Sequence, residues 1–395
     1  MNILVLNAGS SSLKYQLIEM PSKQVKCVGL VERIGMSDAV FTHEKANQKH
    51  SEIGPILDHT AALQKVEAAL MNPDYGVLKN VDEIDAIGHR VVHGGSKYTN
   101  TVLVTEEVKK NIQELADLAP LHNPAHLIGI EVAEDLFKHS KQAVVFDTAF
   151  QQTMPQEAYQ YAIPKKYLVE DKIRAYGFHG TSHKYVSEQA IQYLGPAAKN
   201  IITIHLGNGC SISAIKDGKC VEHSMGLGPS SGLVMGTRSG DIDLSVVIYL
   251  QNKFGKTADE VNHILLKESG LKGLTGHADF RDVADHAAQG DKDCSNALDI
   301  VAHRVKKYIG SYAAILNGLD AIVFTAGIGE NSSLMRELAC KHMDWLGIEL
   351  DPVKNEIRSK KIREIQKNKA KLKILIIPTN EEIEIAQQTY ELLKK

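Results

Sequence analysis

The pattern of hydrophobic and polar positions along this chain predicts strands that alternate with helices. Short runs rich in Ile and Val recur, and each ends in a polar or Gly-bearing loop: DAIGHRVVHGG, QAVVFDTAF, NIITIHLGNG, DAIVFTAGIG and KILIIPTN. Between these runs, amphipathic spacing predicts helices over 105–118, 297–316 and 334–346. This order is typical of an α/β protein, in which ligands gather beyond the carboxyl ends of the strands.

The opening segment MNILVLNAGSSSLKYQLIE predicts a β-hairpin. An apolar strand leads into a turn from Asn7 to Ser12, after which apolar and polar positions alternate again. A tip of Gly and Ser allows backbone N–H groups to approach a phosphate closely. A plain turn at the edge of a sheet fits the same residues, so this segment alone leaves both interpretations open.

A second segment resembles the first. Aligning Gly9 with Gly209 sets LVLNAGSSSLKY against TIHLGNGCSISA, and each has a strand, a turn with Asn and Gly, and an alternating strand. A serine follows two residues after each aligned glycine. We interpret this as an internal repeat, with chance similarity as the alternative. A repeat predicts two related lobes, each offering a phosphate-binding hairpin.

Composition and charge narrow the class of protein. A chain of 395 residues predicts two domains, and its net charge of −3 gives no reason to expect a nucleic acid or an anionic membrane as partner. No apolar run approaches the ~20 residues that span a bilayer, and no secretory signal is evident. The five cysteines are scattered without a CxxC pair, which argues against disulfides and zinc. We expect a cytoplasmic enzyme with no nucleic-acid or membrane partner.

Several segments invite a nucleotide-binding interpretation. GKT at 255–257 is not a Walker-type loop, because Leu250 stands where its first Gly belongs. GNGCSI and GIGENS lack the third Gly of the dinucleotide fingerprint. TAGIGENSSLMREL predicts a strand over 321–325, a Gly-rich turn, and a helix capped by Asn331 or Ser332. That turn suits either a nucleotide or an ordinary strand-to-helix connection. The basic segment 354–373 has no interleaved aromatics, so it predicts a solvated face.

Charged residues follow the predicted strands. Arg90, His179 and Arg238 each stand in a Gly-bearing loop, and arginine presents a fork that matches carboxylate and phosphate groups. Asp147 and Glu381 each follow a strand, and carboxylate oxygens are ligands that Mg²⁺ prefers. The pattern indicates anion chemistry assisted by a metal ion.

Taken together, these motifs resemble the acetate kinase family, within the actin- and sugar-kinase-like superfamily. The match runs through most of the chain in family order, over NAGSSSLK, GHRVVHGG, LAPLHNP, FDTAF, YGFHGTSH, HLGNG, MGTRSGDID, GIGEN and IPTNEE. The resemblance implies an α/β, two-lobed actin/hexokinase-like (ribonuclease H-like) fold of duplicated domains with a cleft between them. It implies an N-terminal lobe over 1–147, joined by the C-terminal helix 382–395, and a nucleotide-binding lobe over 148–381.

The resemblance also implies reversible, ATP-dependent phosphorylation of acetate to acetyl phosphate, with ADP as product, Mg²⁺ as the metal and Mn²⁺ as its substitute. The implied catalytic residues are Asp147, His179 and Arg238, and the implied metal ligands are Asn7 and Glu381. The implied acetate-binding residues are Arg90, Val92, Leu121, Phe178 and Pro229. The implied nucleotide-binding residues are Lys14, His205, Leu206, Gly207, Asn208, Gly209, Asp279, Phe280, Arg281, Gly327, Ile328, Gly329, Glu330 and Asn331. A homodimer is expected as well.

One loop departs from the family pattern. Where the family usually reads Met-Gly-Phe-Thr-Pro-Leu-Glu-Gly, this chain has MGLGPSSGL at 225–233, so that of this stretch Pro229 matches while Leu227, Gly228, Ser230 and Ser231 differ. Because the loop borders the implied acyl pocket, kinase activity on propionate or another short-chain acid is the alternative. A noncatalytic, nucleotide-binding actin-like module is the remote alternative, and the joint presence of Arg90, His179 and Arg238 argues against it.

Overall fold

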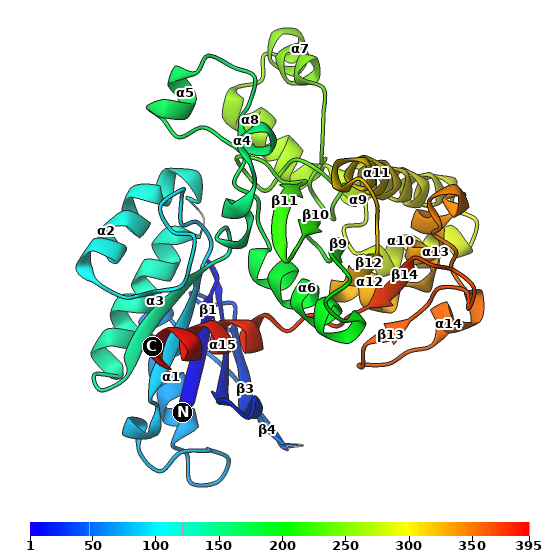
Figure 1. The fold of residues 1–395 in the computed structure, drawn as a ribbon. Coiled ribbons are helices and arrows are strands. Elements are labelled where there is room, and N and C mark those ends of the chain that lie inside the picture. The colour runs from blue at the N-terminus through cyan, green and yellow to red at the C-terminus, as the bar shows by residue number, and fades with distance from the viewer. Residues whose placement is uncertain (47, 121, 395) are drawn as a thin grey trace. The chain divides into compact units, whose positions relative to one another are not determined.

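The computed structural model describes residues 1–46, 48–120 and 122–394. The chain divides into two compact units: unit 1 comprises 1–150 and 380–395, and unit 2 comprises 151–379 (Figure 1). The domain boundaries expected from the sequence, 1–147 with 382–395 and 148–381, stay a prediction.

Unit 1 is built on an eight-stranded sheet with the order β5-β4-β3-β2-β1-β6-β8-β7. Its strands are β1 (Asn2–Ala8), β2 (Ser12–Glu19), β3 (Gln24–Glu32), β4 (Ala39–Lys45), β5 (Gln48–Gly54), β6 (Ala86–Val91), β7 (Val102–Leu103) and β8 (Lys141–Phe146). Strands β1 to β5 form an antiparallel meander, whereas β1, β6 and β8 are parallel. The hairpin predicted for the first residues is confirmed, since β1 pairs with β2 from Asn2 to Ala8.

Helices cover both faces of this sheet. They are α1 (His59–Leu70), α2 (Glu106–Glu114), α3 (Asn123–Leu136) and α15 (Glu381–Lys394). The continuous apolar run of β1 is buried on both sides: Leu4 and Leu6 belong to the same core cluster as residues of α1 and α3, and Ile3 and Val5 cluster with residues of α15. Figure 1 shows α15, in red, lying along β1. Gly88 of β6 permits this close approach, because a Cβ there would lie 2.6 Å from the Thr389 hydroxyl.

Unit 2 has a six-stranded sheet with the order β11-β10-β9-β12-β14-β13. Its strands are β9 (Asn200–Leu206), β10 (Cys210–Lys216), β11 (Lys219–His223), β12 (Ala321–Thr325), β13 (Arg363–Glu364) and β14 (Lys373–Ile376). Its helices are α4 (Gln156–Tyr159), α5 (Lys166–Val169), α6 (Gly180–Leu194), α7 (Leu244–Phe254), α8 (Ala258–His263), α9 (Gly270–Thr275), α10 (Phe280–Ala288), α11 (Lys292–Leu316), α12 (Ala326–Asn331), α13 (Ser333–Cys340) and α14 (Pro352–Glu356).

The two units repeat one topology. In each, three antiparallel strands (β3-β2-β1 and β11-β10-β9) continue into two parallel ones (β6-β8 and β12-β14). The predicted pair of related units is therefore confirmed. The predicted alignment of the two repeats is wrong by two residues. Strands β1 and β9 begin at Asn2 and Asn200, so Gly9 corresponds to Gly207 and not to Gly209. The second hairpin tip is one residue shorter, since its last pair is Leu206 with Cys210 rather than Ala8 with Leu13.

Two of the three predicted helices are confirmed and one is partly wrong. The first forms as α2 followed by a 3₁₀ turn, and the second forms as α11, which begins earlier because Asp291 caps it through the Cys294 N–H. The third ends at Cys340, because His342 takes a positive φ of 59°. The Gly-rich turn over 326–331 is instead the short helix α12, and Ser332 caps α13 as predicted.

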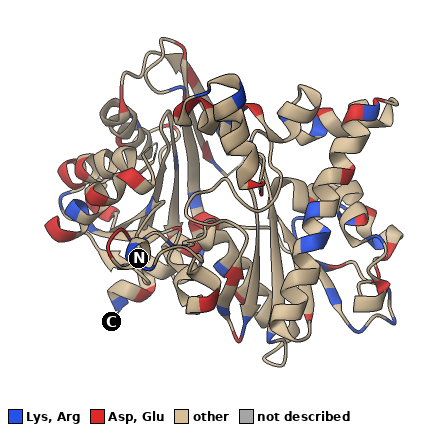
Figure 2. Cartoon of the chain, turned by 90° about the horizontal axis from the view of Figure 1, so that it is seen from above, with Lys and Arg blue, Asp and Glu red and all other residues tan. Residues whose placement is uncertain are grey.

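The distribution of charged and apolar residues is mixed in both units. Figure 2 shows acidic and basic residues interspersed along the helices of both units. Within the part of the chain that the structure describes, no helix combines the length and apolarity needed to cross a membrane.

Candidate active site

Unit 1 gathers four polar side chains where its central strands end. Asn7 lies near the end of β1, Arg90 near the end of β6, and Asp147 directly after β8; the parallel strands bring these ends to one edge. Nη2 of Arg90 lies 3.0 Å from Oδ2 of Asp147, and its Nη1 lies 3.5 Å from Oδ1 of Asn7. Glu381, the first residue of α15, places Oε2 3.9 Å from Nε of Arg90. We call these four residues the Arg90 cluster.

The Arg90 cluster carries more negative charge than it can neutralise. Burial raises the pKa of the Glu381 carboxyl to about 7; Arg90 opposes this shift, and the carboxylates of Asp147 and Glu382 add to it. Burial by itself would lower the pKa of the Arg90 guanidinium, but Asp147 and Glu381 outweigh it and raise that pKa. A further cation at this edge would therefore be stabilised.

The oxygens of the Arg90 cluster suit a magnesium ion. Asn7, Asp147 and Glu381 offer amide and carboxylate oxygens, and Mg²⁺ is usually held by one or two carboxylates together with waters and substrate phosphates. Burial and the neighbouring carboxylates of Asp147 and Glu382 raise the pKa of Glu381, and a cation bound beside it would stabilise its charged form. The residues present thus fit the metal that the sequence implied.

Unit 1 also contains three other residues for which the sequence predicted a role in binding. Lys14 of β2 forms an ion pair with Glu382, and its side chain is half exposed beside the Ser10–Ser12 tip. Val92 is buried and its N–H donates to Nδ1 of His126 at 3.4 Å. Leu121, predicted to line the acyl pocket, lies outside the described residues.

Unit 2 contains a cluster of buried and half-buried histidines at the start of α6. His179 precedes this helix with a φ of 55°, and its Nδ1 lies 2.9 Å from the Ser211 hydroxyl of β10. The same hydroxyl lies 2.7 Å from Nε2 of His183. The ring of His205 stacks on that of His179, with 4.3 Å between ring centroids.

Arg238 lies beside this histidine cluster. A Cβ added at Gly209 would lie 3.3 Å from the ring of His179 and 3.9 Å from Nη1 of Arg238, so both side chains border the same glycine. Arg238 donates to the carbonyl of Pro229 at 3.0 Å, and burial lowers the pKa of its guanidinium. The absence of a side chain at Gly209 allows both groups to lie close to the backbone of this hairpin tip.

A pocket of about 920 Å³ opens among loops and helices of unit 2. Of the predicted nucleotide-binding residues, it is lined by Gly207, Asn208, Asp279, Phe280, Arg281, Gly327, Ile328 and Asn331. His205, Leu206, Gly209, Gly329 and Glu330 are not among its lining residues, although their neighbours are. Asp279 caps α10 and pairs with Arg281, whose hydrogen bonds lower the pKa of that carboxyl to about 2.

Several lining residues were not expected from the sequence. They are Gly236, Leu271, Ala278, Ala284, Asp285, Ser332, Ser333, Leu334 and Arg358. Arg358 belongs to the basic segment predicted to be a solvated face; it is exposed, and it also lines the pocket. In the sequence, Arg358 is one of many basic residues in the segment 354–373, and nothing distinguishes it as a residue that lines a pocket.

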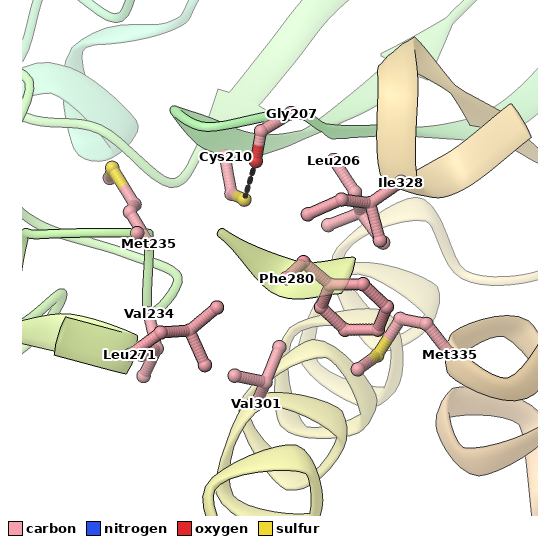
Figure 3. Close-up of a pocket in the computed structure, with 11 residues that line it drawn as sticks. Leu206, Gly207, Cys210, Val234, Met235, Leu271, Phe280, Val301, Ile328 and Met335 are labelled. Atoms are coloured by element: carbon pink, nitrogen blue, oxygen red, sulfur yellow. Dashed lines mark hydrogen bonds between the residues drawn. The ribbon is translucent and has the colours of Figure 1, made fainter. Parts of the chain in front are cut away.

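A second, smaller cavity with an apolar lining shares residues with this pocket. Figure 3 shows Leu206, Val234, Phe280, Ile328 and Met335 converging on a small cavity of about 10 Å³. Cys210 lies at its edge and its thiol donates to the Gly207 carbonyl at 3.2 Å. Gly207, Phe280 and Ile328 line both cavities, so this apolar layer supports the loops that border the larger pocket.

The fold and these sites define the class of protein. Unit 2 carries a glycine-bordered pocket and a histidine–arginine cluster, and unit 1 carries an arginine–carboxylate cluster; each by itself offers groups that suit an anion, as is typical of enzymes that transfer a phosphoryl group. The model of the acetokinase family matches residues 2–387, and the chain belongs to that family.

Individual relatives agree over the full length. The chain is 58% identical to an acetate kinase of Flavobacterium johnsoniae over 394 residues, covering all of both chains. The crystal structure of Porphyromonas gingivalis acetate kinase matches with a TM-score of 0.94 at 42% identity, and that of a propionate kinase from Francisella tularensis with 0.93 at 42%; each match covers 99% of both chains. The resemblance inferred from the motifs and the α/β fold it implied are confirmed.

Proposed function

We propose that this protein catalyses the reversible, Mg²⁺-dependent transfer of the γ-phosphoryl group of ATP to acetate. The observation that carries the proposal is the match to acetate kinases over the entire chain. The Arg90 cluster and the histidine–arginine cluster supply the charges that this reaction needs. The phosphotransferase class, with a carboxyl group as acceptor, follows from the family.

In the forward reaction, a carboxylate oxygen of acetate attacks the γ-phosphorus. The new P–O bond forms as the bond to the oxygen bridging the β- and γ-phosphates breaks, and ADP leaves. Two anions must approach each other, so cationic groups have to offset their repulsion. We assign Arg90 to the acetate carboxylate, and His179 and Arg238 to the transferring phosphoryl group, which their shared border at Gly209 supports.

Asp147 acts through Arg90 in this proposal. A short-chain acid is already ionised at neutral pH, so no base is needed to create the nucleophile. The 3.0 Å ion pair between the nearly inaccessible Asp147 and Arg90 supports a role in fixing the guanidinium fork toward the substrate. We thus assign Asp147 to the orientation of Arg90 and of the metal's water ligands.

Asn7 and Glu381 are the proposed ligands for Mg²⁺, or for Mn²⁺ in its place. When bound, the metal neutralises charge on the β- and γ-phosphates. The nucleotide is assigned to the 920 Å³ pocket, and Lys14 to its phosphates. We assign the flat loop of Gly207 and Asn208 and the start of α12 to contacts with the nucleotide.

Acetate is the favoured substrate, and we assign contacts with its methyl group to Val92 of unit 1 and to Phe178 and Pro229 of unit 2, as the family resemblance implies; the same role is implied for Leu121, which lies outside the described residues. The loop 225–233, which differs from the family pattern, contains an internal hydrogen bond: the Ser231 hydroxyl accepts from the Gly226 N–H at 2.8 Å. Tyr161 accepts from the Leu227 N–H at the same distance. The propionate kinase match keeps propionate as the second candidate, because one methyl group in an apolar pocket discriminates by only ~1–3 kcal/mol.

We predict acyl phosphate formation from ATP and Mg²⁺ with a higher kcat/KM for acetate than for propionate or butyrate. Acyl phosphate is trapped as the hydroxamate, and the three acids are compared under identical conditions. A higher value for propionate would identify the alternative substrate with the mechanism intact. No product from any of the three acids, in a folded protein that binds ATP, would contradict the proposed function.

We further propose a homodimer in which helix α7 contributes to the contact. The helix is apolar, yet none of its residues is buried: Leu244 is 71% exposed, Tyr249 59% and Phe254 62%. An apolar helix without a buried face is typical of a protein interface. A second copy of this chain is the partner we assign, and the cytoplasmic location stays a prediction. The boundaries 1–147 with 382–395 and 148–381 are our proposal for the two domains.

Replacing Ile248 of α7 with aspartate is expected to convert the dimer to a monomer, because a carboxylate would lose its hydration in the contact. Size-exclusion chromatography with light scattering measures the mass. Val353→Asp provides the control, since Val353 is 75% exposed on the separate helix α14 and its replacement should leave the dimer intact. A monomeric wild-type protein would overturn the proposal.

A further inference from the structure

The loop of unit 2 that carries Arg238 is closed where it begins and ends. Over 232–241, the Gly232 N–H donates to Oδ1 of Asp241 at 2.7 Å, and the Asp241 N–H donates to the Gly232 carbonyl at 3.0 Å. Gly240 has a φ of 68°, and a Cβ there would lie 2.6 Å from the Gly232 carbonyl oxygen. The backbone therefore needs a glycine to bring the two ends of the loop together. We call the pair of Gly232 and Asp241 the loop base.

Helix α11 holds the loop base through two side chains. The Tyr308 hydroxyl donates to Oδ2 of Asp241 at 2.7 Å; burial raises the pKa of this tyrosine and the Asp241 carboxylate adds to the shift, so the hydroxyl keeps its proton. Nη1 of Arg304 donates to the Gly232 carbonyl at 2.9 Å and lies 3.6 Å from Oδ2 of Asp241. One carboxylate oxygen of Asp241 thus binds the loop, and the other binds the helix.

The direction of the Arg238 guanidinium depends on the loop base. Its Nη1 donates to the Pro229 carbonyl at 3.0 Å, and the Arg238 carbonyl accepts from the Met235 N–H at 3.1 Å. Pro229 stands three residues before Gly232, and Arg238 stands three residues before Asp241. The pairing of Gly232 with Asp241 therefore fixes how far the guanidinium lies from the carbonyl that orients it.

We propose that Asp241 is a positioning residue for Arg238, because its carboxylate closes the loop base and fixes it to α11. The contribution of Arg238 to phosphoryl transfer rests on the proposed function. The closed loop base does not, because it follows from contacts within unit 2.

The kinetic test is a double-mutant cycle of Asp241→Ala with Arg238→Ala, measured with the hydroxamate trap. In the protein that retains Arg238, Asp241→Ala is expected to lower kcat about 10- to 100-fold, with KM for acetate and ATP within about threefold. In Arg238→Ala, the same replacement is expected to change kcat by less than about twofold, since no guanidinium remains to be positioned. A residue that only stabilised the fold of unit 2 would not show this dependence on Arg238.

Asp320→Ala is the matched control. Oδ2 of Asp320 accepts from the N–H groups of Lys199 and Asn200, each at 2.8 Å, so this carboxylate also binds backbone N–H groups of unit 2. Asp320 lies directly before β12 and beside the first residue of β9, whereas the predicted nucleotide-binding residues follow the ends of these strands. We expect Asp320→Ala to leave kcat within about twofold of the wild type.

Hydrogen–deuterium exchange tests the closed loop base without relying on activity. Mass spectrometry of the full-length protein is expected to show faster backbone exchange over 232–241 in Asp241→Ala than in the wild type, because the Gly232 N–H loses its acceptor. Unchanged exchange over this loop would overturn the proposal. Failure of the proposed function is recognised separately, because it would appear as absent acyl phosphate formation by the wild-type protein whatever its exchange.

Two kinetic results would also overturn the proposal: a kcat of Asp241→Ala within about threefold of the wild type, or an equal further loss of kcat in the Arg238→Ala background. If Asp241→Ala fails to fold, Tyr308→Phe takes its place in the cycle, since it removes only the hydroxyl that fixes the carboxylate to α11. Tyr308→Phe is expected to lower kcat about 3- to 10-fold when Arg238 is present and to have no effect on kcat in Arg238→Ala. An equal loss in both backgrounds would contradict the positioning role.

Discussion

Replacing Arg238 with alanine is expected to lower kcat for acyl phosphate formation by about a thousandfold. Arg238 is half-buried and borders the same glycine as His179, where the transferring phosphoryl group is assigned. Partial removal of the guanidinium from water strengthens its interaction with an anion. In Arg238→Ala, water that fills the space of the side chain would not supply this positive charge. The loss should fall on kcat rather than on KM, because the charge to be stabilised develops during transfer.

The measurement is steady-state kinetics with the hydroxamate trap, and thermal unfolding checks the fold. Arg238 donates to one carbonyl and contacts one sulfur, so we expect an unfolding temperature close to that of the wild type. Arg281→Ala offers a contrast, because Arg281 is largely exposed in the nucleotide pocket and should raise KM for ATP with little change in kcat. A kcat within about tenfold of wild type in Arg238→Ala would contradict the assigned role.

The sequence allowed much of the fold to be predicted because its signals are local. Strand β1 reads as a buried apolar run, and the hairpin that follows has its own turn residues. The repeat was visible for the same reason, although its register depended on a hairpin tip that differs by one residue. The end of α13 was missed, because a single positive φ at His342 stops a pattern that otherwise continues.

The grouping of candidate site residues was predictable where these residues follow neighbouring strands. Arg90 and Asp147 come from neighbouring parallel strands, so their 3.0 Å contact follows from topology. Arg358 was not predictable in this way, because it reaches the pocket from a loop after α14. The contact of Ser211 with His179 depends on how α6 packs against β9 and β10, and tertiary packing of this kind leaves no periodic signal in the sequence.

Replacing Glu381 with glutamine is expected to stabilise the metal-free protein above pH 7 and to weaken its binding of Mg²⁺. Burial raises the pKa of this carboxyl from 4.5 to about 7, so the folded protein binds more protons than the unfolded chain between these values. Wild-type stability is therefore lost as the pH rises from about 4.5 to about 7. The shift corresponds to at most about 3 kcal/mol, and the 22% exposure of the side chain reduces it. Glutamine keeps the shape without the charge.

Thermal unfolding at pH 5 and pH 8, with a chelator or with Mg²⁺, measures this effect. At pH 8 without metal, Glu381→Gln should unfold at a higher temperature than the wild type, and the difference should shrink at pH 5 because the wild-type carboxyl is then protonated. Added Mg²⁺ should stabilise the wild type more than the variant. Acyl phosphate formation by the variant should require about tenfold more Mg²⁺, since one proposed ligand has lost its charge.

Glu382→Gln is the matched control on the next residue of α15. Glu382 pairs with Lys14 but also repels Glu381, so its replacement removes one attractive and one repulsive interaction and should stabilise the metal-free protein at pH 8 less than Glu381→Gln does. A Glu381→Gln protein that is less stable than the wild type at pH 8 without metal would show that this carboxylate is already compensated by Arg90. The charge imbalance of the Arg90 cluster would then not be what favours a metal ion. The expected result would instead show that the Glu381 carboxylate destabilises the metal-free protein and stabilises the fold only when a cation is bound. This is the behaviour of a residue selected for metal binding rather than for stability.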